Sequence, residues 1–427
     1  MATALLFGGF IFFAAVSVPI GISLGMAVML VIIATGTVDL TFMAQGLTTS
    51  MNSFPLMAAP FFILAGEVMG RGGISRRLLK LADIAFGRFT GGLGLVTVVA
   101  CMLFAAISGT GSATVAAIGS IMVPEMLKKG YNKGFAGGLV ASSGAIGAMI
   151  PPSITMVIYC VTAGVSITAL FSAGIVPGIV IGLSLMIYTL IYSKKNGYKG
   201  SSQRYTTKEV LAVIKDGIPA ILMPVIILGG IYGGVFTPTE AAAVAVVYGF
   251  IVALFVYKEI SFKDVGEIVL KSALMTSVIL VIIGTSAGFG RILALERIPQ
   301  LIANAIVGFS SSKIVILLLL NLLLLFVGTF METLAAVIIL TPILLPIVTS
   351  FGMSPVHFGV MMVINLAIGF VTPPLGANLF VTTQIMDISF EEVSRAIIPF
   401  IITMVIALLF ITFVPIISLG LPTLLGF

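Results

Sequence analysis

The chain has 427 residues, of which 59% are hydrophobic and 8% charged, and its mean hydropathy is +1.27. Soluble domains carry about 25% charged residues, so this composition excludes a soluble protein and predicts an all-α polytopic membrane protein. The net charge of +6 does not indicate binding to nucleic acid, because the basic residues lie in short loops between apolar segments.

Several classes of function are excluded by residues that the sequence lacks. Its two cysteines, Cys101 and Cys160, lie inside apolar segments, and His357 is the only histidine. A disulfide framework and a transition-metal cluster are therefore not expected. There is no GxxxxGK[ST] motif for ATP, and no HExxH or Gly-x-Gly-Asp motif for an intramembrane enzyme.

The first predicted helices lie in residues 5–35, where Pro19 and Gly21 separate two short helices. No basic n-region precedes them, so they are expected to be retained rather than cleaved as a signal peptide. A third helix is predicted over 54–69. Residues 70–83 are basic on one side and apolar on the other, which is typical of a helix lying at the membrane interface.

Residues 90–129 are predicted to form two helical arms around a tip of sequence Ser-Gly-Thr-Gly-Ser. Each arm of some 17 residues gives roughly 25 Å of helix. This length fits two full spans or a re-entrant hairpin, and the Gly, Ser and Thr content of the tip favours the hairpin. A helix broken between Gly144 and Pro152 is predicted over 134–163, followed by a span over 169–192.

A hydrophilic linker over 194–217 joins a first repeat, 1–193, to a second, 218–427. In the second repeat Thr237-Pro238-Thr239-Glu240 is a capping box, so Glu240 is expected to cap a helix. The other predicted elements are a helix over 218–232, a polar loop over 258–271, a span over 272–290, an amphipathic segment over 291–307, a second hairpin over 314–348, a second broken helix over 358–386 and a last span over 396–419.

Two motifs recur at matched positions of these repeats. Gly-Thr-x-x-x-Thr-x-Ala-Ala begins at Gly109 and at Gly328, and Ala-Ile-Gly-x-x-x-Pro-Pro begins at Ala145 and at Ala367. In a bilayer every backbone polar group must be satisfied, so interrupted helices occur where they face a cavity. Paired interruptions in two repeats are typical of a binding site at the repeat interface.

The distribution of basic residues predicts the orientation of the repeats. If the two hairpins enter from opposite sides, 18 of the 21 Lys and Arg residues lie on one side and 3 on the other. The richer side is cytoplasmic by the positive-inside rule. The first hairpin then enters from the cytoplasm, the second from outside, and both termini lie outside, which is an inverted repeat.

The tips and breaks supply uncharged oxygen atoms, which suit a monovalent cation, and half-helix N-termini, which suit an anion. The first predicted cation site comprises Ser108, Gly109, Thr110, Gly144, Gly147 and Pro151. The second comprises Gly328, Thr329, Gly369, Thr372 and Pro373. An anionic substrate is expected between the tips, near Ser112, Ser153 and Asn378. Thr114 is expected to lie on a helix arm, outside the first site.

Two carboxylates are candidates for coupling. Thr329 to Glu332 fits a capping box, and this role for Glu332 is favoured over proton coupling. Glu67 is expected to pair with a nearby Arg at the interface, with coupling as the alternative.

At these residues the chain resembles the large membrane (M) subunit of tripartite ATP-independent periplasmic (TRAP) transporters. The resemblance covers the whole chain, including residues 70–88, the tip at 108–112 and both Pro-Pro breaks, and its general character is nearest to the sialic-acid branch. One departure is Gly109, which stands where some members of the wider superfamily have Asn, so a side-chain ligand is not expected there.

The resemblance implies an elevator carrier of the ion-transporter superfamily in a bacterial inner membrane, driven by about two or more Na⁺ ions without ATP. It also implies a small membrane (Q) subunit, a periplasmic substrate-binding (P) protein and an organic acid such as sialic acid (N-acetylneuraminate). A C4-dicarboxylate transporter subunit and a stand-alone anion carrier are the alternatives within this class.

Overall fold

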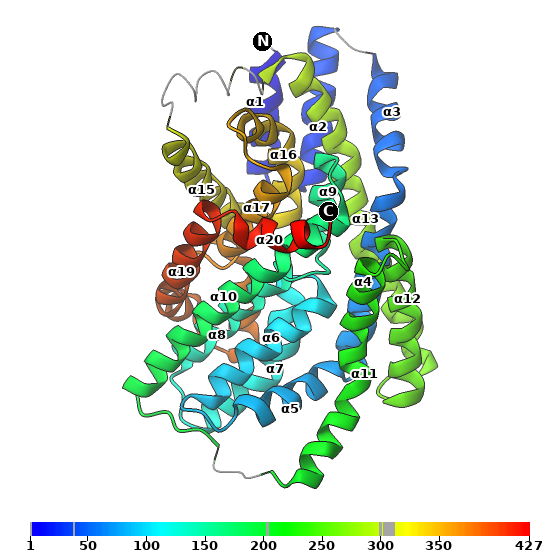
Figure 1. Ribbon diagram of the computed structural model, residues 1–427. Coiled ribbons are helices and arrows are strands. Elements are labelled where there is room, and N and C mark those ends of the chain that lie inside the picture. Colours follow the sequence, from blue (N-terminus) through cyan, green and yellow to red (C-terminus); the bar gives the residue numbers. More distant parts are fainter. Residues whose placement is uncertain (1, 37–38, 202–204, 299–300, 302–311) are drawn as a thin grey trace.

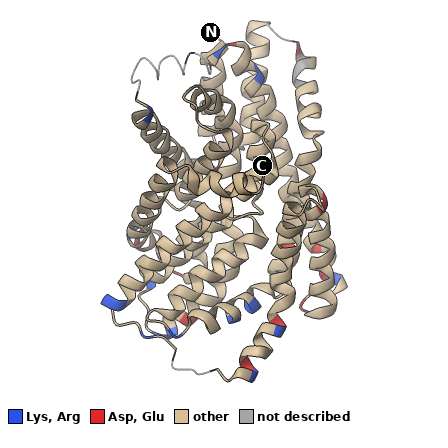
Figure 2. Ribbon diagram, viewed as in Figure 1, with Lys and Arg blue, Asp and Glu red and all other residues tan. Residues whose placement is uncertain are grey.

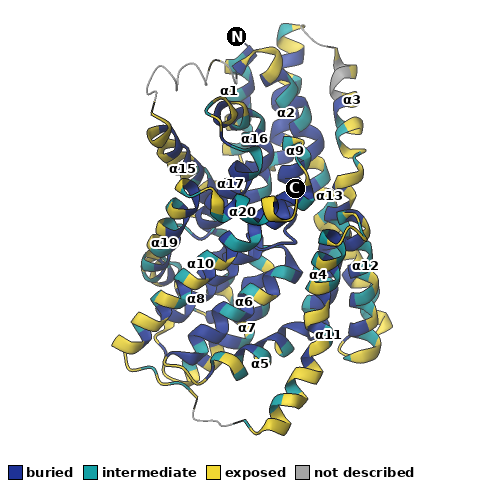
Figure 3. Ribbon diagram, viewed as in Figure 1, coloured by how far each residue is buried: buried dark blue, intermediate teal, exposed yellow. Residues whose placement is uncertain are grey.

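The computed structural model describes residues 2–36, 39–201, 205–298, 301 and 312–427, and every regular element in them is a helix. Eight of the described helices are long and apolar enough to cross a membrane. The prediction of an all-α polytopic membrane protein is therefore confirmed. Large apolar side chains such as those of Ile402 and Ile406 are exposed. Figure 3 shows exposed residues along the outward sides of the helices, where a membrane protein contacts lipid.

The first half of the chain contains α1 (Ala2–Ala15), α2 (Ile20–Thr35), α3 (Leu40–Met51), η1 (Phe54–Met57), α4 (Ala58–Arg71), α5 (Ile74–Phe86), α6 (Gly92–Ser108), α7 (Gly111–Lys128), α8 (Lys133–Ala145), η2 (Ile146–Ala148), α9 (Ile154–Ala163) and α10 (Ile167–Lys195). The second half contains α11 (Thr207–Tyr232), α12 (Pro238–Ile251), the π-helical η3 (Val252–Val256), α13 (Phe262–Leu295), α15 (Lys313–Phe330), α16 (Thr333–Ser350), α17 (Pro355–Gly369), α18 (Ala377–Met386), α19 (Phe390–Phe413) and α20 (Ile416–Leu424).

These helices pack into two groups. One group consists of α1–α4 with α11–α13, and the other of α6–α10 with α15–α20. In Figure 1, α3, α4, α11 and α12 lie on the right, and α8, α10, α15 and α19 on the left. The groups meet where α4 contacts α6 and α9 and where α13 contacts α16, and α5 packs between α6 and α11.

Within the second group the two halves of the chain exchange helices. Helix α9, which ends the first broken helix, packs on α16 and α17 of the second half. Helix α18, which ends the second broken helix, packs on α7 and α8 of the first half. Each hairpin therefore lies against a segment from the opposite half of the sequence.

Arg77 joins helix α5 to the first group, in addition to the packing of this helix on α11 and α4. The guanidinium of Arg77 lies 3.6 Å from the ring centroid of Tyr257 and forms ion pairs with Asp216 at 3.4 Å and Glu259 at 3.1 Å. Its side chain is only 15% exposed. A guanidinium stacked on a ring and paired with two carboxylates is held in one orientation.

Several predicted boundaries are wrong in the same direction. Residues 207–217 of the predicted linker belong to α11, and residues 262–271 of the predicted loop over 258–271 belong to α13. Helix α13 also continues through Arg291 to Leu295. Capping boxes at Thr206 and Ser261 start α11 and α13, so these helices begin in polar sequence.

Two further predictions differ from the structure or cannot be compared with it. The predicted last span is two helices, α19 and α20, separated at Val414 and Pro415, because proline lacks the N–H that would continue the helix. Of the predicted amphipathic segment over 291–307, residues 299–300 and 302–307 lie outside the described residues.

The capping box at Glu240 is confirmed, with its side chain 2.8 Å from the backbone N of Thr237.

Basic residues gather toward one end of the molecule. Figure 2 shows most Lys and Arg around the lower ends of α5, α10, α11 and α12, and few near the upper end. The segment between α10 and α11, described at 196–201 and 205–206, lies at this lower end (Figure 1).

Candidate functional site

The first hairpin turns at Gly109 and Thr110, between α6 and α7. Gly109 has φ +63°, the left-handed region that favours glycine. The hydroxyl oxygens of Ser108 and Thr114 lie 2.8 Å apart, and Thr114 donates a hydrogen bond to the carbonyl oxygen of Thr110 at 2.8 Å. The prediction that Thr114 lies outside this tip is therefore wrong, because the first turn of α7 brings it back to Ser108.

The first tip lies directly against the break between α8 and α9. The backbone N–H of Ile154 donates to the carbonyl oxygen of Gly109 at 3.3 Å. A Cβ at Gly147 would lie 2.3 Å from the Thr110 carbonyl oxygen, and one at Gly144 would lie 2.2 Å from Val115. Pro151 lies in the non-helical segment of this break. Glycine is thus required at 144 and 147 for the hairpin to approach.

The second hairpin repeats this approach with backbone against backbone. A Cβ at Gly369 would lie 2.5 Å from the Cα of Gly328, and one at Gly328 would lie 3.0 Å from the Cα of Gly369. Thr329 donates to the Phe326 carbonyl at 2.7 Å, and Thr372 donates to the Ile368 carbonyl at 2.7 Å. Each hydroxyl already donates its proton in a hydrogen bond, so the lone pairs of its oxygen remain available to bind a cation.

At both tips some of the carbonyl oxygens already accept hydrogen bonds from the protein. At the first tip the carbonyls of Gly109 and Thr110 accept hydrogen bonds from the protein. At the second tip Thr372 lies just before Pro373, in the non-helical segment between α17 and α18. The Gly369 carbonyl at this break is also engaged, by the N–H of Thr372 at 2.8 Å, so both tips combine engaged carbonyls with hydroxyl oxygens.

Glu332 caps a helix, but not in the predicted register. Helix α16 begins at Thr333, and Glu332 is its N-cap, accepting hydrogen bonds from the backbone N–H groups of Leu334 at 2.9 Å and Ala335 at 3.2 Å. Thr329 is still in α15 and caps nothing. The predicted Thr-x-x-Glu box fails because the chain is extended at Met331.

A cavity of about 110 Å³ lies between the two tips. Thr110, Gly111 and Ser112 line it from the first hairpin, and Glu332 and Thr333 line it from the second. The rest of its wall comes from the broken helices, α4, α13 and α16, with the lining residues Ala145, Ala148, Ile154, Thr155, Ala367, Phe370, Ile63, Met275, Ile279 and Leu334. Residues from both halves of the chain thus enclose one small space.

Of the three predicted substrate contacts, only Ser112 lines this cavity. Ser153 is the N-cap of α9: its hydroxyl donates to the Ala148 carbonyl at 2.6 Å and accepts from the Met156 N–H at 3.3 Å. Asn378 is fully buried behind the first tip, with its Nδ2 3.2 Å from the Cβ position of Gly111. Neither side-chain polar atom of Asn378 has a hydrogen-bond partner within the described part of the chain.

Glu67 lies outside the cavity between the tips. It pairs with Arg71 at 3.1 Å, as expected, and also with Lys271 of the second half at 2.8 Å. Among the residues that the structure describes, no group of three His, Cys, Asp or Glu side chains could hold a metal ion.

Sequence reasoning missed Thr114, Thr155 and the α13 residues that face the tips. Thr114 was available as the second threonine of the repeated Gly-Thr-x-x-x-Thr motif. Met275 and Ile279 give no local signal, because an apolar residue on a membrane helix looks the same whether it faces lipid or a cavity.

Comparison with known proteins points to one family. The family model of the tripartite ATP-independent periplasmic transporter, DctM component, matches residues 7–417. The isethionate TRAP transporter permease protein DctMQ of Oleidesulfovibrio alaskensis is 50% identical over 410 residues, which are 96% of this chain and 65% of that protein. This chain therefore spans slightly less than two thirds of that relative.

Two other relatives carry different substrate names. The C4-dicarboxylate TRAP transporter large permease protein DctM of Rhodobacter capsulatus is 39% identical, with 100% of both chains covered. The sialic acid TRAP transporter large permease protein SiaM of Vibrio cholerae is 38% identical, with 95% of both chains covered. Among solved structures, the YdaH transporter of Alcanivorax borkumensis has a similar fold, with a TM-score of 0.64 at 13% identity, covering 90% of this chain and 88% of that one.

Proposed function

Because this chain belongs to the DctM component family of tripartite ATP-independent periplasmic transporters, we propose that it carries a small organic anion inward by symport with sodium. Members of this family are transporters, and the chain is a multi-pass membrane permease rather than an enzyme. One observation carries the proposal: residues 110–112 of the first hairpin and 332–334 of the second, at matched ends of the two repeats, line a single cavity.

The two tips are proposed to hold one sodium ion each. The first site would use the oxygens around Ser108, Thr110 and Thr114, and the second the hydroxyls of Thr329 and Thr372 with nearby carbonyls. Unwound backbone and half-helix ends are the usual Na⁺ ligands in inverted-repeat transporters. The anion would lie between them, near Ser112, where two cations offset its charge.

The substrate is proposed to be a compact anion, with isethionate as the first candidate. The relative named for isethionate is 50% identical and the one named for sialic acid 38%. The cavity of about 110 Å³ is also small beside the roughly 300–1,000 Å³ of pockets for drug-sized ligands. We therefore place isethionate before the sialic acid that the sequence favours, with C4-dicarboxylates as the second candidate.

The transport cycle is proposed to be an elevator movement in a bacterial inner membrane. The group of α6–α10 with α15–α20, which holds both tips, would move against the group of α1–α4 with α11–α13, with α5 as a connecting arm. A small membrane (Q) subunit and a periplasmic substrate-binding (P) protein would complete the transporter. The excess of Lys and Arg at the end opposite the N-terminus (Figure 2) supports a cytoplasmic linker and a periplasmic N-terminus. A periplasmic C-terminus is part of the same proposal.

Vesicle uptake tests this function directly. Proteoliposomes containing the chain with its small subunit receive labelled isethionate, succinate or N-acetylneuraminate, with and without a sodium gradient and a binding protein. Two Na⁺ with one monovalent anion move one net charge, which is worth about 2.3 kcal/mol per 100 mV, so an inside-negative potential is expected to accelerate uptake. Uptake without sodium refutes the coupling, and uptake without a binding protein favours a stand-alone carrier.

A further inference from the structure

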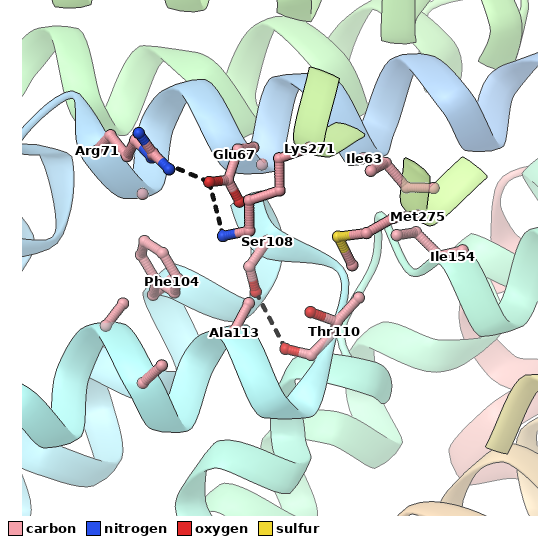
Figure 4. A pocket seen from close by; sticks show the side chains of 14 residues that line it. Ile63, Glu67, Arg71, Phe104, Ser108, Thr110, Ala113, Ile154, Lys271 and Met275 are labelled. Atoms are coloured by element: carbon pink, nitrogen blue, oxygen red, sulfur yellow. Dashed lines mark hydrogen bonds and ion pairs between the residues drawn. The ribbon is translucent and has the colours of Figure 1, made fainter. Parts of the chain in front are cut away.

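A second cavity, of about 300 Å³, lies beside the first hairpin and has a charged end (Figure 4). Ser108, Thr110 and Ala113 line it from the hairpin, and Glu67, Arg71 and Lys271 line it from α4 and α13. Figure 4 shows Glu67 between the two cationic side chains, with Ser108 and Phe104 facing them. The lining therefore carries two positive charges and one negative charge.

One carboxylate oxygen holds both cations. The Oε1 atom of Glu67 lies 3.1 Å from Nε of Arg71 and 2.8 Å from Nζ of Lys271. Arg71 has a second carboxylate partner, Glu267, at 2.7 Å. Within the described residues, Lys271 has only Glu67 as an ion-pair partner. Lys271 is therefore the cation that can accept another anion most easily, while Arg71 and Glu267 keep Glu67 in place.

This cavity adjoins the one between the tips. Ile63, Thr110, Ile154 and Met275 line both cavities. Met275 lies one helical turn from Lys271 on α13, so the two residues share a face of that helix. An anion leaving the tips past Met275 would meet the Lys271 ammonium group next. Lys271 is 53% exposed, whereas Glu67 is 16% exposed, so the lysine can turn toward solvent as the anion departs.

We propose that Lys271 is a release-side anion site, in which the ammonium group exchanges its ion pair with Glu67 for the sulfonate or carboxylate of the departing substrate. This inference rests on the proposed function, because it assumes that an organic anion passes the tips. Glu67 then has a defined role: it neutralises Lys271 when no anion is present and displaces the anion afterwards.

The test measures anion occupancy without transport. Ala116 lines this cavity but not the one between the tips and is exposed, whereas Cys101 and Cys160 are buried. Ala116→Cys thus provides a selective thiol for an impermeant reagent in inside-out vesicles of the full transporter. Isethionate at constant ionic strength is expected to slow the reaction, and ethylene glycol at the same concentration is not.

Removal of the lysine charge gives the decisive comparison. Lys271→Gln is expected to raise the half-protecting isethionate concentration about tenfold, the effect of losing one charge-assisted hydrogen bond. Lys271→Arg should retain protection. Lys271→Met, which keeps the apolar stem, replaces the glutamine variant if the latter does not fold. Lys128→Gln is the matched control, because Lys128 pairs with Glu125 at the same 2.8 Å but lies outside the cavity.

Two results would overturn the release site: no protection by isethionate with Lys271 intact, or the same half-protecting concentration with and without the lysine charge. Failure of the proposed function looks different, because it appears as absent sodium-driven uptake in the proteoliposome assay whatever the thiol reaction shows.

Discussion

Thr372→Val is expected to weaken one sodium site and leave the other intact. Valine keeps the shape of threonine but removes the hydroxyl oxygen at the second break. In the structure this hydroxyl donates to the Ile368 carbonyl at 2.7 Å, so its oxygen has only lone pairs to offer a cation at the second tip. The substitution therefore deletes one cation ligand without opening a cavity.

The size of the effect follows from the kind of contact that is lost. An interaction between a neutral polar group and an ion is worth about 1.5–3 kcal/mol in proteins. Taking about 2 kcal/mol, the sodium dissociation constant of the second site should rise about thirtyfold. The lost hydrogen bond to Ile368 also costs about 1 kcal/mol of stability, and this part must be measured separately.

Thr341→Val supplies that control. Thr341 is fully buried in α16 and donates to the carbonyl four residues earlier, Val337, at 2.6 Å. It makes the same kind of contact as Thr372, in the same helix group, but belongs to neither proposed sodium site. Its valine variant should lose similar stability in thermal unfolding and keep the sodium affinity of the parent protein.

Equilibrium binding of radioactive sodium to the purified protein gives the readout. The parent is expected to bind two ions, and in Thr372→Val half of the binding should move to about thirtyfold higher sodium concentration. Three results would refute the second sodium site: an unchanged sodium-binding isotherm in Thr372→Val, an equal shift of the isotherm in Thr341→Val, or full uptake supported by protons alone. Glu332 would then be the leading coupling residue.

Three further predictions concern packing, stability and orientation. Gly369→Ala should abolish sodium-coupled uptake, because its Cβ would lie 2.5 Å from the Gly328 backbone. Gly229→Ala should be tolerated, because a Cβ at Gly229 would have nothing within 4 Å. Equal uptake by the two variants would contradict the close approach of Gly328 and Gly369. Arg77→Ala should destabilise the purified protein by about 1–3 kcal/mol in thermal unfolding. Arg76→Ala should cost less than about 1 kcal/mol, because the Arg76 side chain is 64% exposed and forms an ion pair at 3.5 Å. A larger loss for Arg76→Ala than for Arg77→Ala would show that α5 is anchored elsewhere. A tag near Lys199 should stay unlabelled by an impermeant reagent on intact cells, and labelling there would invert the proposed topology.

The interruptions of the helices could be predicted from sequence because their causes are local. Glycine at 109 and the proline pairs at 151–152 and 373–374 act on the backbone of their own segment. Helix ends in polar sequence could not be predicted in the same way. Apolar runs mark the part of a helix that lies in lipid, while capping boxes such as that at Ser261 extend α13 well beyond it.

Contacts between distant segments also could not be predicted from sequence. Lys271 was assigned to a loop, yet α13 carries it to Glu67, 204 residues away in the chain. Asn378 was expected near the anionic substrate, yet the packing of α18 on α7 puts it behind the first tip. In both cases a residue's neighbours depend on which helices pack together, and no periodicity within one segment records that.

The exchange of α9 and α18 between the halves has a consequence for assembly and for the proposed movement. Neither half of the chain contains all the helices on which its own hairpin packs, because α9 of the first half packs on α16 and α18 of the second half packs on α7. A half expressed alone should remain incomplete, whereas two fragments cut between α10 and α11 and produced together should reassemble. The same interlocking joins the two tips through shared helix contacts, so both proposed ion sites would travel together in the proposed elevator movement.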